Sequence, residues 1–168
     1  MNDNSVINKL FAHMQWADSQ IWNTIEKDSD MKENEDLKKL LYHIHIVQFV
    51  FLQIWKKEKF EYPKVEEFDN LEALKNWSIE NNKNINDFLD NASDEKINEI
   101  ANVPWSKNYA EKIGKDVEQI TIKESMLQVI SHSTHHRAQI NKKLKELGCA
   151  PPMVDFIVWL WEGKPHIL

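Results

Sequence analysis

Hydrophobic residues recur at three- and four-residue steps along four long stretches of the chain, the period of a helix with one buried face. These stretches run from about Val6 to Glu26, Glu35 to Lys57, Asn70 to Asn91 and Thr121 to Leu147. Only three glycines and five prolines interrupt the whole sequence, so its elements should be long. The pattern predicts an all-α fold, a four-helix bundle.

The segments outside these stretches predict smaller features. Residues 97–121, with Pro104 and Gly114, resemble a hairpin or extended loop, a long ordered crossover between the third and fourth helices. A short helix should follow over residues 155–161 and pack back on the bundle. The polar run 78–84 indicates that the third helix faces solvent over much of its length or lines a wet cavity.

Composition narrows the class of protein. A chain of 168 residues fits one domain, 1–168, with a real core. Cys149 is the only cysteine, which favours a reducing compartment. The sequence shows no secretory leader and no apolar run near the ~18 residues that a transmembrane helix needs. We therefore expect a cytoplasmic protein.

Charge and glycine content argue against two classes of partner. The formal net charge is -6, which opposes binding to polyanions, so nucleic acid is not expected as a partner. Three glycines leave no room for a phosphate-binding or dinucleotide-binding loop.

The candidate chemistry lies in the fourth helix, where His132 and His136 are four residues apart. A helix turns ~100° and rises ~1.5 Å per residue, so both imidazoles point from one face and could bind one metal ion. Seven histidines in 168 residues also make such a pair common by chance. By the same geometry His135 lies ~180° from the centre of the apolar stripe and should be at the surface.

A catalytic metal site needs a third protein ligand and an open position. The second helix offers His43 and His45, which lie ~200° apart, so at most one can face the site. Periodicity leaves this choice open because the helix is apolar over a broad arc. For His45 an ordinary histidine at a helix flank is the preferred interpretation.

Asp18 and Arg137 each occupy the centre of an otherwise apolar stripe. Burying either charge alone is costly, so each needs a partner. We expect one buried polar network beside the histidines, with Asp18 pairing with Arg137 or orienting a ligand imidazole. The alternative is a wet stripe in which both reach solvent.

Four motifs together resemble the DinB-like (YfiT-like) family of metal-dependent four-helix proteins. They are Trp16-Ala17-Asp18, Leu41-Tyr42-His43-Ile44, the run from His132 to Gln139, and the run from Gly148 to Phe156. The family usually has glycine at the position of Ala138 and often asparagine at that of Asp18. Neither departure removes a ligand.

The resemblance implies a divalent metal, zinc or nickel with manganese as a further option, held by His43, His132 and His136. Members resemble thiol S-transferases, which join a low-molecular-weight thiol to an electrophile. Others are described as hydrolases or as damage-inducible proteins. The sequence therefore leaves three functions open: a transferase, a metal-dependent hydrolase, and a non-catalytic, stress-induced metal-binding protein. No general base or other catalytic side chain is evident.

The resemblance also implies a homodimer. An outward-facing Trp16 and the run Trp159-Leu160-Trp161 would fit a subunit contact, although both could equally pack within one chain.

Overall fold

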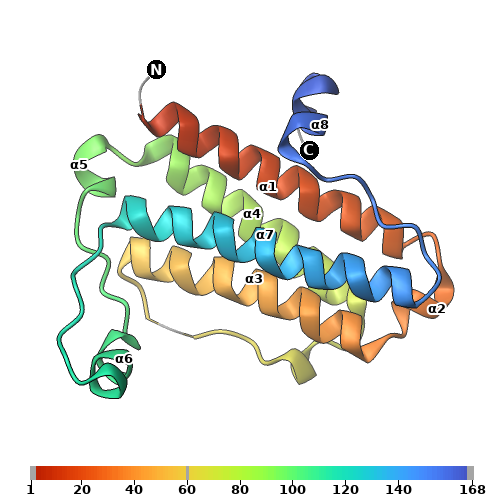
Figure 1. Cartoon of the computed structure of the whole chain (residues 1–168), viewed down its shortest axis with the longest axis horizontal. Helices are drawn as coiled ribbons and strands as arrows, with labels where there is room; N and C mark the ends of the chain where they lie inside the picture. The colour runs from red at the N-terminus through yellow and green to blue at the C-terminus, as the bar shows by residue number, and fades with distance from the viewer. Residues whose placement is uncertain (1–2, 60, 166–168) are drawn as a thin grey trace.

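Four long helices packed side by side make up the body of the protein (Figure 1). The structure is a computed structural model that describes residues 3–59 and 61–165. The long helices are α1 (Asp3–Ile25), α3 (Glu35–Lys56), α4 (Leu71–Asn91) and α7 (Ile122–Glu146). Over this described part of the chain no strand forms, and the predicted all-α fold is confirmed.

The helix starts follow from local capping. The side chains of Asn34, Asn70 and Thr121 accept hydrogen bonds from backbone N–H groups in the first turns of α3, α4 and α7. Each cap satisfies one of the donors that a helix leaves unpaired at its start. Thr121 and Glu124 complete a reciprocal capping box.

The order of helices around the bundle differs from their order in the chain. α1 packs against α4 and α7, and α3 packs against the same two helices, so α1 and α3 lie diagonally. In Figure 1, α1 and α7 run one way and α3 and α4 the other. Because α3 and α4 are parallel, the segment between them must return along the bundle.

This returning segment covers the outer face of α3. The Tyr42 hydroxyl donates to the Pro63 carbonyl oxygen at 2.9 Å, and the Tyr42 and Phe68 rings pack together. A 3-10 turn, η1 (Val65–Glu67), lies in the same segment. Ile46, one turn after Tyr42 on α3, is also buried.

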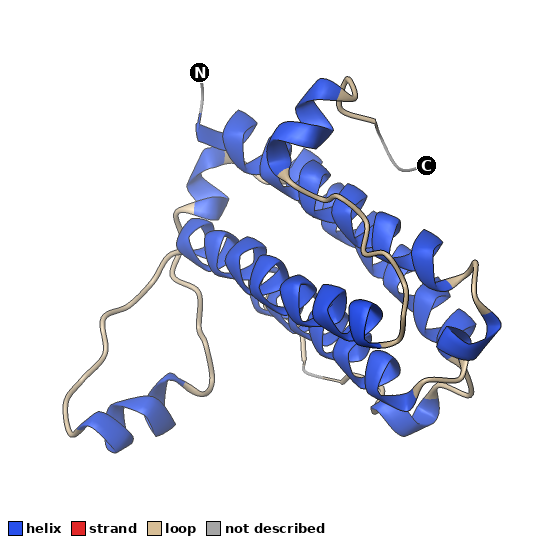
Figure 2. Cartoon of the chain, turned by 45° about the vertical axis from the view of Figure 1, so that its right-hand side comes forward, coloured by secondary structure: helices blue, strands red, loops and turns tan. Residues whose placement is uncertain are grey.

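The connection between α4 and α7 contains two helices, α5 (Asp94–Ile97) and α6 (Ser106–Ile113). The hairpin interpretation holds only at its base, where Ile100 and Thr121 form one antiparallel bridge. Figure 2 shows α6 at the end of two loop segments, apart from the long helices. The expectation of extended structure was therefore wrong for α6, which ends at Gly114 in a left-handed conformation (φ 70°).

Two short helices flank the body. α2 (Ser29–Lys32), which the sequence analysis missed, joins α1 to α3, and α8 (Phe156–Trp161) forms where a short helix was expected. Trp16 and Ala17 of α1 pack with Trp159 of α8 in a buried cluster. Trp16 is therefore not outward-facing, because α8 covers it within the same chain.

A layer of polar side chains divides the buried core into two apolar clusters. The layer takes residues from all four long helices at one level of the bundle: Asp18, His45, Gln48, Ser78, Asn81, Ser133 and Arg137. Both the candidate site and a pocket between α1 and α4 lie beside this layer.

Among the helices of the described residues, none is both long enough and apolar enough to cross a bilayer.

Candidate metal centre

Three histidines from two neighbouring helices converge on one side of the polar layer. His43 comes from α3, and His132 and His136 come from successive turns of α7. One nitrogen from each ring lies within 4.8 Å of the others. His43 is exposed and the other two are partly buried, so the cluster opens to the surface between α3 and α7.

The spacing of the ring nitrogens fits a single ion. Nε2 of His43 lies 3.2 Å from Nε2 of His136. Two nitrogens bound to a tetrahedral Zn²⁺ at about 2.0–2.1 Å would be about 3.3 Å apart. Nδ1 of His132 is buried and makes no hydrogen bond to the described residues. The cluster could therefore bind a metal ion.

A hydrogen-bond chain on the surface of α7 sets the tautomer of His136. The oxygen Oε1 of Gln139 can only accept, so Nδ1–H of His136 donates to it at 2.8 Å. The amide nitrogen of Gln139 donates in turn to Nε2 of His135 at 3.3 Å. Nε2 of His136 is left with its lone pair facing His43, which is the state that a metal ligand requires.

The electrostatic environment favours the neutral form of two of the three rings. Burial, together with the neighbouring rings of His136, His43 and His135, lowers the pKa of His132 to about 4. Burial and His136 also lower the pKa of His43. Because neutral imidazole is the form that binds metal, protons compete poorly at these two rings near neutral pH.

The sequence profile of the DinB family matches residues 1–164. The chain belongs to the DinB family. No curated protein matches the chain. The resemblance proposed from the four motifs is thus confirmed over nearly the whole length of the chain.

In this DinB family member, the choice between His43 and His45 has a structural answer. His43 faces His136, whereas His45 is 1% exposed and points into the polar layer. His45 is therefore a core residue and not the ordinary flank residue that was expected. His135 is exposed, as its helical position predicted; its ring packs edge-on against that of His136, with 4.9 Å between the centroids, and it is also linked to His136 through Gln139.

The expected pairing of Asp18 with Arg137 is also confirmed. Oδ1 of Asp18 accepts from Arg137 at 2.5 Å, and both side chains are at most 5% exposed. The guanidinium also donates to the Thr134 hydroxyl at 3.2 Å. The wet-stripe alternative is therefore wrong.

Asp18 forms hydrogen bonds with other members of the polar layer and not with a ligand imidazole. Its Oδ2 accepts from Nε2 of Gln48 at 2.9 Å, and Gln48 also donates to Ser133 at 3.1 Å. His45 donates from Nδ1 to Oε1 of Gln48 at 3.1 Å, and its Nε2 accepts from the Trp22 indole at 3.2 Å. These contacts specify a neutral His45, consistent with burial lowering its pKa.

Sequence reasoning missed Gln48 and the role of Gln139. Gln48 lies four residues after Ile44 and three before Phe51, on the apolar stripe of α3, and that position was an available signal. Gln139 lies three residues after His136, a spacing that places two side chains together on a helix.

Proposed function

We propose that this DinB family protein is a metal-dependent thiol S-transferase, with His43, His132 and His136 holding a zinc or nickel ion. The observation that carries the proposal is the convergence of three imidazoles at a surface-open site. A divalent metal bound there would supply the positive charge that keeps a small thiol deprotonated near neutral pH.

The residues around the site favour a thiol over water as the nucleophile. Within the described residues the ligand group contains histidines only, with no Asp, Glu or Cys. A thiol has a pKa of about 8.5, far below the 15.7 of water, so it needs much less help to lose its proton. Hydrolysis would make the greater demand on a general base.

The protein's own groups would orient the reaction. Gln139 fixes the ring of His136 through Nδ1–H, and the exposed edge of the cluster at His43 leaves an approach from solvent. The thiol proton would pass to solvent. The sulfur would then form a bond to the electrophilic carbon as the leaving group departs with its electron pair.

The test compares turnover with and without a thiol. Metal-free protein should gain activity toward a monohalogenated bimane when zinc, nickel or manganese is added together with a small thiol such as cysteine or glutathione. His136→Ala should lose both metal binding and activity. Gln119→Ala is the control, because Gln119 is exposed in the loop before α7 and contributes no atom to the cluster.

Two outcomes would replace the proposal. Metal-dependent release of product from an ester in the absence of thiol would indicate a hydrolase. Stoichiometric metal binding with no turnover of either substrate would indicate a non-catalytic metal-binding protein.

We further propose that the protein works as a homodimer. The outer face of α8 supports this proposal, because Ile157 and Trp161 are 47% and 77% exposed one turn apart, and Met153 just before the helix is 70% exposed. Apolar side chains gathered in this way are common at subunit contacts.

A further inference from the structure

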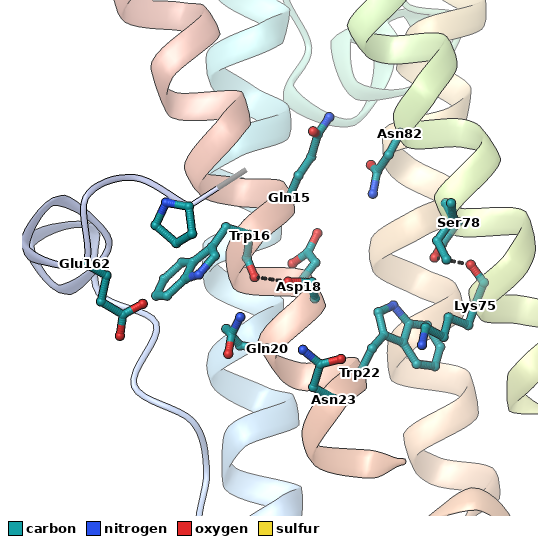
Figure 3. A pocket seen from close by; sticks show the side chains of 13 residues that line it. Gln15, Trp16, Asp18, Gln20, Trp22, Asn23, Lys75, Ser78, Asn82 and Glu162 are labelled. Atoms are coloured by element: carbon teal, nitrogen blue, oxygen red, sulfur yellow. Dashed lines mark hydrogen bonds between the residues drawn. The ribbon is translucent and has the colours of Figure 1, made fainter. Parts of the chain in front are cut away.

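A second candidate site lies on the side of the bundle opposite the histidines. A pocket of about 460 Å³ is formed mainly by α1 and α4, whereas the histidine cluster lies between α3 and α7. Its volume is within the range of about 300–1,000 Å³ typical of small-molecule sites. Figure 3 shows its floor along α1, with α4 on one side and the segment after α8 on the other.

One buried acceptor at the pocket lacks a hydrogen-bond donor. Oδ1 of Asn82 is buried without a hydrogen-bond partner among the described residues, and the side chain of Asn82 extends toward the cavity in Figure 3. The hydroxyl of Ser78, also on the wall, gives its proton to the Lys75 carbonyl oxygen, so it can only accept from a ligand. An unsatisfied buried acceptor is costly, and a ligand N–H group would remove that cost.

The charges at the pocket are already compensated. Asp18 is paired with Arg137, and Lys75 with Glu26, each at 2.5 Å. Only Glu162 adds a further charged group to the lining. An anionic ligand would therefore find no uncommitted cation among the lining residues, and a neutral ligand fits better than an anion.

Amide and indole groups supply the remaining recognition chemistry. Four amide side chains line the pocket, those of Gln15, Gln20, Asn23 and Asn82, and each offers a C=O beside N–H donors. Trp16 and Trp22 contribute apolar surface. Trp22 is held rigidly, since its ring stacks on His45 at 11° and its indole N–H donates to that residue.

We propose that this pocket binds a small, neutral, flat molecule that carries a carboxamide, a group with an N–H donor next to a carbonyl oxygen. Its N–H would satisfy Oδ1 of Asn82, its carbonyl would accept from a neighbouring amide, and its ring would pack on the indoles. This site goes beyond the proposed transferase function and does not depend on it.

The test uses nicotinamide as the probe and N,N-dimethylnicotinamide as a matched probe without N–H donors. In ¹⁵N-labelled full-length protein, millimolar nicotinamide should shift the Asn82 side-chain amide and the Trp22 indole signals saturably. The dimethyl compound should bind about tenfold more weakly, the loss expected for one hydrogen bond. Equal responses to the two probes, or no response to either, would overturn the proposal.

Variants locate the site. Asn82→Leu should abolish the nicotinamide response, and Asn84→Leu on the same helix should preserve it, because Asn84 does not line the pocket. An unchanged response in Asn82→Leu would contradict the assignment. If that variant does not fold, the comparison of the two probes on the unaltered protein still decides the question.

Discussion

At the scale of single residues, the state of each histidine is set by the groups that its ring contacts. His136 donates through Nδ1 to Gln139 and so presents a bare Nε2 to His43. His45, two residues after His43 in the chain, donates to Gln48 and accepts from Trp22 inside the bundle. Two histidines of one helix, two positions apart, thus lie in different surroundings: His43 in a group that could bind a metal ion, and His45 in the buried polar layer.

Gln139 should strengthen metal binding without touching the ion. Gln139→Leu removes the acceptor of the Nδ1–H of His136 and frees its ring to turn, so we expect metal affinity to fall about 10–100-fold. Titration against a chromophoric chelator measures this change. Gln119→Leu, at an exposed glutamine in the loop before α7, is the control and should bind as the unaltered protein does. Equal affinities for the two variants would rule out the orienting role.

Acidification should destabilise the metal-free protein. The pKa values of His13, His43, His45 and His132 are all lowered, chiefly by burial. Below pH ~6.5 the unfolded chain therefore binds more protons than the folded one, and stability falls as the pH falls. For His132 this loss continues to about pH 4, where the folded form also takes up its proton.

Urea unfolding of the metal-free protein at pH 7 and pH 5 measures this effect. The midpoint should be lower at pH 5. The lowered pKa values of Asp36, Glu99 and Glu124 act only below their ordinary values near 4, outside this window. His45→Gln should reduce the difference between the two pH values, and a midpoint that rises at pH 5 would contradict the assignment.

At the scale of helices, the histidine cluster and the buried ion pair each join side chains from two helices, and the two pairs of helices differ. The cluster spans α3 and α7, and the Asp18–Arg137 pair spans α1 and α7. α7 therefore carries functional groups on one flank and a buried charge on its core face.

Breaking the Asp18–Arg137 pair should destabilise the bundle strongly. Arg137→Met leaves a buried carboxylate without its cation and should cost about 3–5 kcal/mol. Asp18→Leu leaves the buried guanidinium of Arg137 without its anion and should lower the free energy of unfolding by a similar amount. The double variant should lose much less than the sum of the two, because it leaves neither charge unpaired. Denaturant unfolding of the four proteins gives the coupling free energy, and additive losses would show that the pair does not act as a unit.

The helices themselves could be predicted because their signals are local. Periodicity, Asn70, Thr121 and Gly148 set the bounds of α4 and α7 closely. The choice between His43 and His45 could not be made this way. Tyr42 contacts the returning segment and Ile46, one turn further along α3, is buried as well, so no single apolar stripe identifies the inner side of the helix.

α6 illustrates a different limit. Trp105, Tyr109 and Ile113 recur every four residues, yet Pro104 and Gly114 at the two ends favoured a loop interpretation. The three side chains are 37–55% exposed, so no packing against the bundle reinforced the weak local signal. Trp105 alone reaches α3, where its ring meets that of Phe51.

At the scale of the whole molecule, the polar layer lies between two candidate sites that face opposite directions. Ser133 and Arg137 of the layer alternate along α7 with His132 and His136 of the cluster. Asp18 of the same layer lines the pocket between α1 and α4. One level of the bundle thus holds most of the buried polar side chains of the described residues.

The homodimer proposal is tested by mass in solution. Sedimentation at micromolar concentration should give twice the 19.9 kDa of one chain. Trp161→Glu should shift the protein toward monomer, because it places a charge on the most exposed apolar side chain of α8. Tyr62→Glu changes an exposed aromatic residue elsewhere and should leave the dimer intact. A mass of one chain for the unaltered protein would refute the proposal.

The diagonal placement of α1 and α3 makes α7, the last long helix in the chain, the element that completes the bundle. His43 and His136 are 93 positions apart, so a growing polypeptide cannot assemble the cluster until α7 has been synthesised and docked. A metal that binds only the closed form would add about 2.7 kcal/mol at a hundredfold excess over its dissociation constant. Cellular metal supply would then govern how often the chain opens to proteases, and hence its lifetime and abundance.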